Sequence, residues 1–133
     1  MYKHVFVAAV ATLVSLPVMA QTPPVTNYAV RPGETINLGA NYWVAPTCQN
    51  MALAKPDIEQ LSGPAGLVFE FREAMVMPQN VVGCKSEIKG GYIWLTVPHD
   101  IEGTDAHVVL RITQHDRNGP QPRGYAFNLM IAR

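Results

Sequence analysis

Proline and glycine recur along most of this chain at short and fairly even intervals. The sequence contains 11 prolines and 10 glycines. Both residue types disfavour the interior of a long helix, because proline lacks an amide hydrogen and glycine loses much backbone entropy on folding. The spacing therefore predicts short strands joined by turns and leaves little room for long helices.

Several segments between these breaks alternate apolar and polar residues with the period of two that half-buried strands show. In the segment Tyr92–Val97, for example, Tyr92 and Trp94 alternate with an apolar set, and Glu70 and Arg72 alternate in the same way in an earlier segment. The residues expected on the core side of these strands are Leu67, Phe69, Phe71, Ile93, Leu95, Val97, Val108, Leu110, Ile112, Tyr125, Phe127, Leu129 and Ile131.

Weaker patterns complete the prediction towards the N-terminus. Strands are expected over Val25–Val30, Glu34–Leu38 and Asn41–Val44, whereas Pro56–Leu61 fits either a strand or one helical turn. A long, proline-rich turn is expected over Arg117–Gly124. About seven or eight short strands, each apolar on one face, predict an all-β antiparallel sandwich of two sheets packed face to face.

The first 20 residues have the features of an export signal. Lys3 and His4 give a polar, cationic start, and the mainly apolar run from Val5 to Val14 is too short to span a bilayer as a permanent helix, which needs about 20 apolar residues. Val18-Met19-Ala20 supplies the small residues that a signal peptidase recognises. We therefore expect a signal peptide over residues 1–20, one domain over 21–133, and a periplasmic or secreted product.

The chain contains two cysteines, Cys48 and Cys84. In an exported domain of this size the expectation is one disulfide between them, and two free thiols are the alternative. A Cys-x-x-Cys redox motif is absent from the sequence. The bridge is therefore expected to be structural.

The segment from Cys84 to the end resembles small bacterial immunoglobulin-like and cadherin-like domains of exported proteins. The resemblance rests on Tyr92–Pro98, Gly103-Thr104-Asp105, the apolar strand His107–Ile112 and the final strand Tyr125–Ile131. It implies an immunoglobulin-like sandwich, and it implies little about activity because such sandwiches carry many functions. Ala106-His107 and the proline-rich Arg117–Gly124 segment depart from the pattern of these domains.

Composition narrows the classes of function. The ten Lys and Arg residues are matched by ten Asp and Glu residues, and no run of one sign occurs. This balance argues against nucleic acid and against a basic membrane-binding face, and no further segment resembles a membrane span. Past the leader the serines are Ser62 and Ser86, and neither lies in a Gly-x-Ser-x-Gly elbow. We expect no catalytic residues and no cofactor.

Two sets of residues could hold a metal ion. His99, His107 and His115, together with Met75 and Met77, have the imidazole and thioether groups that suit copper. Asp100, Glu102 and Asp105 place carboxylates in a glycine-containing loop, as calcium requires, although the spacing is not that of an EF-hand. Surface histidines and a turn-forming Asp105 are the simpler interpretations, and metal binding is kept as the alternative function.

Recognition of a partner is the favoured function. Tyr92 and Trp94 would be exposed if Ile93, Leu95 and Val97 face the core, and aromatic side chains on a rigid strand are good anchors for a protein or a glycan. Tyr42 and Trp43 allow the same interpretation. The loops 98–106 and 114–124 are expected to add contacts. A chagasin-like protease inhibitor is disfavoured because Ala45-Pro46-Thr47-Cys48 is the nearest approach to the Asn-Pro-Thr-Thr-Gly loop of those inhibitors.

Overall fold

The computed structural model describes residues 25–79 and 81–133. The predicted signal peptide lies outside these described residues. The described chain contains strands and turns, and no helix long and apolar enough to cross a membrane is found in it. The seven strands are β1 (Thr26–Val30), β2 (Thr35–Asn41), β3 (Asp57–Ser62), β4 (Val68–Val76), β5 (Ile88–Thr96), β6 (Asp105–Asp116) and β7 (Gly119–Ile131).

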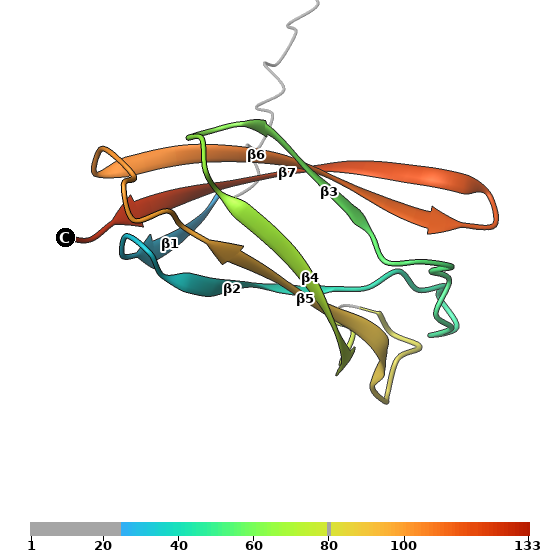
Figure 1. Ribbon diagram of the computed structural model, residues 1–133. Coiled ribbons are helices and arrows are strands. Elements are labelled where there is room, and N and C mark those ends of the chain that lie inside the picture. Colours follow the sequence, from blue (N-terminus) through green and yellow to red (C-terminus); the bar gives the residue numbers. More distant parts are fainter. Residues whose placement is uncertain (1–24, 80) are drawn as a thin grey trace, which may run out of the picture.

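The strands form two sheets that pack face to face (Figure 1). One sheet has four strands in the order β1-β7-β6-β3, and the other has three in the order β2-β5-β4. The pairing of β1 with β7 is parallel, and the other pairs are antiparallel. The expected β-sandwich is therefore confirmed.

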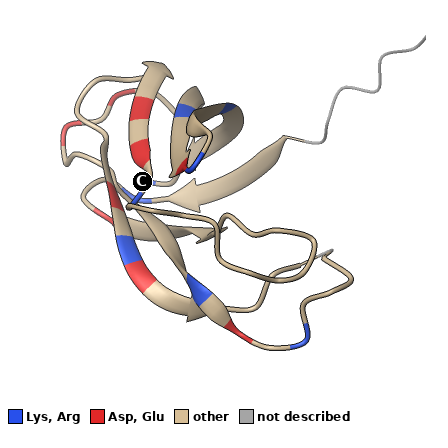
Figure 2. Ribbon diagram, turned by 90° about the vertical axis from the view of Figure 1, so that its right-hand side faces the viewer, with Lys and Arg blue, Asp and Glu red and all other residues tan. Residues whose placement is uncertain are grey.

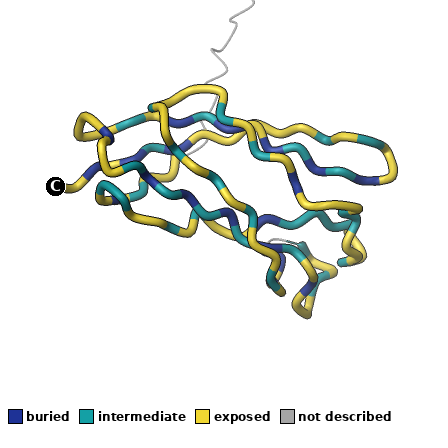
Figure 3. Tube along the Cα trace, in the orientation of Figure 1, coloured by how far each residue is buried: buried dark blue, intermediate teal, exposed yellow. Residues whose placement is uncertain are grey.

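The core lies between the two sheets, where buried positions recur along the facing strands (Figure 3). The expected inward residues of β5, β6 and the second half of β7 are all buried, and Leu67, Phe69 and Phe71 pack against them while partly exposed. Tyr125 differs, since it is 46% exposed. It lines a cavity that is described below.

The close packing of β4 on β5 depends on one glycine. A Cβ atom on Gly91 would lie 2.4 Å from the carbonyl oxygen of Arg72 and 2.5 Å from the ring of Phe71. Carbon atoms do not approach this closely, so only glycine lets the Phe71 ring lie against β5 at this point.

Two sequence predictions about individual segments need correction, and for a third segment the strand alternative is confirmed. The predicted strand Asn41–Val44 is not a separate strand, because β2 continues to Asn41 and Val44 makes only an isolated bridge to Asn50. The segment Pro56–Leu61 forms strand β3 rather than a helical turn. The long turn predicted over Arg117–Gly124 is also wrong, because the chain turns at residues 117–118 and β7 begins at Gly119.

Prolines fit inside β7 because of the side on which their nitrogen atoms lie. The amide of Ile131 bonds towards the β6 side, to Thr104, whereas that of Ala132 bonds to Val30 at the end of β1. Because alternate amides point to opposite sides, the nitrogens of Pro120 and Pro122 point away from β6. The side of β7 that they face is unpaired here, because β1 pairs only with Phe127–Ile131. A proline at such an edge breaks no bond in the sheet and removes a donor that another strand could use.

Candidate functional site

The outer face of the three-stranded sheet brings together Tyr92, Trp94 and polar side chains of the neighbouring strands. Trp94 lies on the central strand β5 and is paired in register with Asn37 of β2 and Glu70 of β4. Tyr92 is paired in the same way with Ala40 and Arg72. Both aromatic residues are partly exposed, and the alternate residues Ile93 and Leu95 are buried. We call the set Thr35, Asn37, Glu70, Arg72, Tyr92, Trp94 and Thr96 the Trp94 face.

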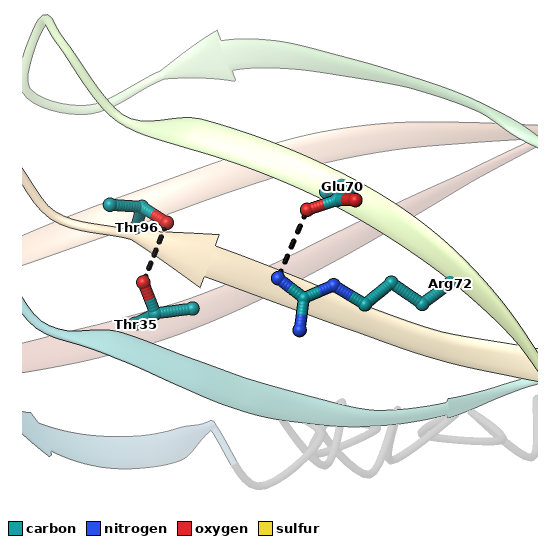
Figure 4. A network of polar contacts seen from close by, with 4 residues as sticks. All are labelled: Thr35, Glu70, Arg72 and Thr96. Atoms are coloured by element: carbon teal, nitrogen blue, oxygen red, sulfur yellow. Dashed lines mark hydrogen bonds and ion pairs between the residues drawn. The ribbon is translucent and has the colours of Figure 1, made fainter.

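Contacts within the Trp94 face fix several of its side chains. The guanidinium carbon of Arg72 lies 4.7 Å from the centre of the Trp94 ring, and Arg72 Nη2 donates to Glu70 Oε2 over 3.1 Å. The hydroxyls of Thr35 and Thr96 are 2.8 Å apart (Figure 4). Stacking of a guanidinium on an indole is favourable and restricts both groups. The face is therefore partly organised in the unbound molecule.

The Trp94 face has both apolar and hydrogen-bonding groups without an excess of charge. Glu70 and Arg72 neutralise each other, and Figure 2 shows acidic and basic residues interspersed along the strands. On the other side of the same sheet, beyond the core, Lys89 Nζ lies 3.7 Å from Glu73 Oε1. Such a surface can bind a ligand that is uncharged or carries charges of both signs, through ring stacking and hydrogen bonds. It does not have the excess of positive charge that binding of nucleic acid requires.

The opposite outer face is more polar. His107 Nδ1 lies 2.7 Å from Asn128 Oδ1, and Asn128 Nδ2 donates to Asn27 Oδ1 over 3.1 Å, so these three residues form a row across β6, β7 and β1. His115 Nε2 lies 2.6 Å from Asp57 Oδ2 on β3. Among the described residues, this face has no partly exposed aromatic pair comparable with Tyr92 and Trp94.

The other predicted aromatic pair has a structural role. Trp43 donates its indole N–H to Asp116 Oδ2 over 2.9 Å, and the guanidinium of Arg123 lies over the Trp43 ring at 4.7 Å. The Trp43 hydrogen bond, with a second from the backbone N–H of Asn118, lowers the pKa of Asp116 below its ordinary value. Tyr42 bonds through its hydroxyl to the backbone of Gln79. Trp43 therefore joins the loop after β2 to the β6–β7 turn.

The disulfide is confirmed. Cys48 and Cys84 are bonded, with their Cα atoms 4.8 Å apart, and join the loop after β2 to the loop before β5. Cys48 has a positive φ of 64°, which a non-glycine residue adopts at some cost. Next to it, a Cβ on Gly83 would lie 2.3 Å from the carbonyl oxygen of Pro46, so the two loops are in close contact.

The candidate metal ligands are not brought together. His99 packs against Gly33 in the β1–β2 turn, whereas His107 and His115 lie eight positions apart on the single strand β6. Met75 and Met77 are 55% and 42% exposed, so they do not fill the core as methionines in such patterns usually do. Asp100, Glu102 and Asp105 are exposed. Over residues 25–79 and 81–133, no group of three His, Cys, Asp or Glu side chains could hold a metal ion.

Sequence reasoning found the two aromatic residues of the Trp94 face but missed their neighbours. Glu70 and Arg72 were predicted to face outward, yet nothing in the sequence shows that β4 lies beside β5 in the register that places Arg72 on Trp94. Thr35 and Asn37 come from β2, more than fifty positions earlier than Trp94. The useful signal was the alternation within each strand, and the pairing of strands had to come from the structure.

Comparison with known proteins adds little to this geometry. No protein-family model matches the chain, and no curated protein matches it. Among solved structures, the chain is similar to one described as the solution structure of Amebosin. The two are 15% identical, with a TM-score of 0.44, and the likeness covers 80% of this chain and 89% of the other. A likeness at this level supports no statement about function.

Proposed function

We propose that this chain is an exported, immunoglobulin-like β-sandwich that binds a protein or glycan partner and has no catalytic activity of its own. The strand grouping supports the immunoglobulin-like type. In constant immunoglobulin domains the first, second, fourth and fifth strands share one sheet, and the third, sixth and seventh share the other. Here β2, β4 and β5 form one sheet and β3, β6 and β7 belong to the other, as in those domains, whereas β1 differs because it pairs with β7.

The disulfide supports export to the periplasm or the cell exterior. Disulfides persist in oxidising compartments and are rare in the reducing cytosol. The two cysteines lie in loops 36 positions apart and are bonded to each other. This agrees with the signal peptide predicted over residues 1–20.

The absence of a nucleophile motif in the sequence supports a non-catalytic role. Asp57 and His115 form the kind of carboxylate–imidazole pair that a catalytic triad uses. Such a pair needs an activated serine or cysteine nearby. Both cysteines are consumed by the disulfide, and neither Ser62 nor Ser86 has a nucleophile-elbow sequence. We therefore interpret the Asp57–His115 contact as a surface hydrogen bond between β3 and β6 and not as part of a catalytic site.

The observation that carries the proposal is the Trp94 face. Binding energy in protein interfaces is concentrated in a few residues, with Trp, Tyr and Arg enriched among them. Trp94, Tyr92 and Arg72 lie together on one sheet face, and Arg72 is already stacked on the Trp94 ring. Because these side chains are already held in contact, little conformational entropy is lost when a partner covers the face.

Capture experiments with matched variants test the proposal. The folded chain without its leader is immobilised and exposed to the envelope fraction and envelope glycans of the source cells, and bound material is quantified. Trp94→Ser should weaken binding of the captured partner by about tenfold or more, because it removes the central anchor. Met130→Ser removes a 55% exposed side chain from the other sheet and should change little.

Two results would contradict the proposal. One is a partner that binds wild type and Trp94→Ser equally well. The other is turnover of a substrate in a broad hydrolase screen that a single substitution abolishes, since the chain would then be an enzyme.

A further inference from the structure

A cavity of about 270 Å³ lies between the two sheets on the side where β2 faces β1 and β7. Thr26 and Gly39, both exposed, lie among its lining residues, so the cavity opens to solvent there. None of the lining residues is charged. The side chains that give it its apolar character are Leu38, Ile93, Leu110, Ile112, Tyr125 and Phe127.

The size and chemistry of this cavity define what could occupy it. An engineered apolar cavity of about 150 Å³ in another protein holds a benzene molecule, so a larger one has room for an aromatic ring or a branched aliphatic side chain. Two of the polar groups beside it are already bonded: Tyr28 Oη donates to Leu38 O over 2.8 Å, and Gln114 Nε2 donates to Asn41 Oδ1 over 2.7 Å. In the described part of the chain, no buried side-chain nitrogen or oxygen lacks a partner. The occupant should therefore be apolar and uncharged.

The strand beside the cavity is an edge strand, and the Tyr28 hydroxyl occupies one of its carbonyls, that of Leu38. β2 is the last strand of its sheet, and its sequence Thr-Ile-Asn-Leu-Gly-Ala-Asn contains neither a charged residue nor a proline. A bulge between Asn37 and Gly39 interrupts its pairing with β5. The space beside the strand is free at the bulge, because a Cβ on Gly39 would meet no atom within 4 Å.

The other free edges carry the features that discourage strand addition. Charges, prolines, bulges and short length protect an edge strand from pairing with another chain. β4 carries Glu70, Arg72 and Glu73, and β3 carries Asp57 and Glu59. β1 is only five residues long, and the part of β7 beyond it contains Pro120 and Pro122. β2 has a bulge but neither a charge nor a proline, and it lies directly beside the apolar cavity.

We propose that β2 and this cavity form a groove for an extended, uncharged peptide segment of a partner protein. The segment adds to the sheet as a strand along β2 and places one aromatic or aliphatic side chain in the cavity. In this mode of recognition the backbone hydrogen bonds provide affinity, and the pocket selects the side chain. The groove lies at the edge of the sheet rather than on the Trp94 face, so this proposal stands or falls separately from the proposed function.

A displayed library of random seven-residue peptides tests the groove. Selection on the wild-type domain should enrich peptides that contain one large apolar residue and no charge beside it. Thr26→Trp, at the opening of the cavity, should weaken the selected peptides by about tenfold or more, since it occupies the space of the anchor. Ala29→Trp is the matched control, because Ala29 lies on the same strand, is exposed, and does not line this cavity. Circular dichroism checks that both variants fold.

Methylation of the peptide backbone tests strand addition itself. In a strand added to an edge, every second amide faces the partner strand. Methylating one alternate set of amides should weaken binding by about tenfold, because backbone hydrogen bonds are lost, and methylating the other set should have little effect.

Several outcomes would overturn the proposal. Failure to enrich any peptide would do so, as would selected peptides that bind Thr26→Trp as well as wild type. Equal binding of both methylated sets would show that only the apolar side chain is recognised. A wild-type dimer in solution that Thr26→Trp dissociates would show that the occupant is a second copy of this chain.

Discussion

Single residues fix local contacts that alternation in the sequence does not show. Alternation correctly places Ile93 and Leu95 in the core and Trp94 on the surface, because every second side chain of a strand points to the same face. It does not show that Trp43 donates to Asp116, which is 73 positions later, or that Arg72 stacks on Trp94. These contacts depend on which strands are neighbours, and that information is not local.

Gly91 offers a test of packing between β4 and β5. Gly91→Ala should lower the free energy of unfolding by about 1–3 kcal/mol, because the new methyl group meets the Arg72 carbonyl and the Phe71 ring. Gly124→Ala is the control, since a Cβ there meets nothing within 4 Å. Urea unfolding of the two variants gives the comparison. Equal stability of the two would contradict the close approach.

Asp116 should make part of the stability of the fold sensitive to acid. Its hydrogen bond from Trp43 lowers its pKa in the folded state, so the unfolded chain takes up the proton first as the pH falls. The stabilisation is present above the unfolded pKa, which is about 4, and is lost as the pH falls through the lower folded value. Asp116→Asn should therefore show a smaller fall in urea midpoint between neutral and acidic pH than wild type.

Trp43→Phe should have the same effect on the acid dependence, because it removes the main donor to Asp116. If either variant kept the full acid dependence of wild type, the hydrogen bond would not be its origin.

At the scale of elements, the faces of the strands were predicted better than their ends and their partners. β5 and β6 were recognised with the correct face inward. The start of β7 was missed, because Pro120 and Pro122 are typical of turns and their place on an edge could not be seen from the sequence. The parallel pairing of β1 with β7 joins the two ends of the described chain and has no local signal.

The prolines of β7 should keep this edge from pairing with a second molecule. Pro122→Thr restores an outward amide donor, so we expect association that increases with protein concentration. Analytical ultracentrifugation of this variant beside Gln121→Thr measures the effect. Gln121 lies on the same strand, but its amide faces β6, so Gln121→Thr adds no outward donor and should behave like wild type. Equal behaviour of both variants would mean that the prolines do not protect the edge.

For the whole molecule, the disulfide closes a loop that contains β3 and β4. A bridge between residues 36 positions apart restricts the unfolded chain by about 3–4 kcal/mol in the entropy model. Replacing both Cys48 and Cys84 by alanine should lower the free energy of unfolding by about this amount. Urea unfolding under oxidising conditions measures it, and a reducing agent should destabilise wild type but not the variant. A variant as stable as oxidised wild type would contradict a stabilising role.

The arrangement as a whole gives the molecule two different outer faces. One carries a polar row with His107 and Asn128, and the other carries the Trp94 face. The fold class and the aromatic pair could be predicted from the sequence. The groove beside β2 could not, because it is lined by residues of five strands that only the packing of the two sheets brings together.

Hydrogen–deuterium exchange on the domain, alone and bound to its captured partner, tests the central claim most directly. The account predicts that the partner slows exchange in β2, β4 and β5, the strands of the Trp94 face, and leaves β3 and the middle of β6 unchanged. Protection confined to β3 and β6, with exchange at β4 and β5 unaltered, would contradict it.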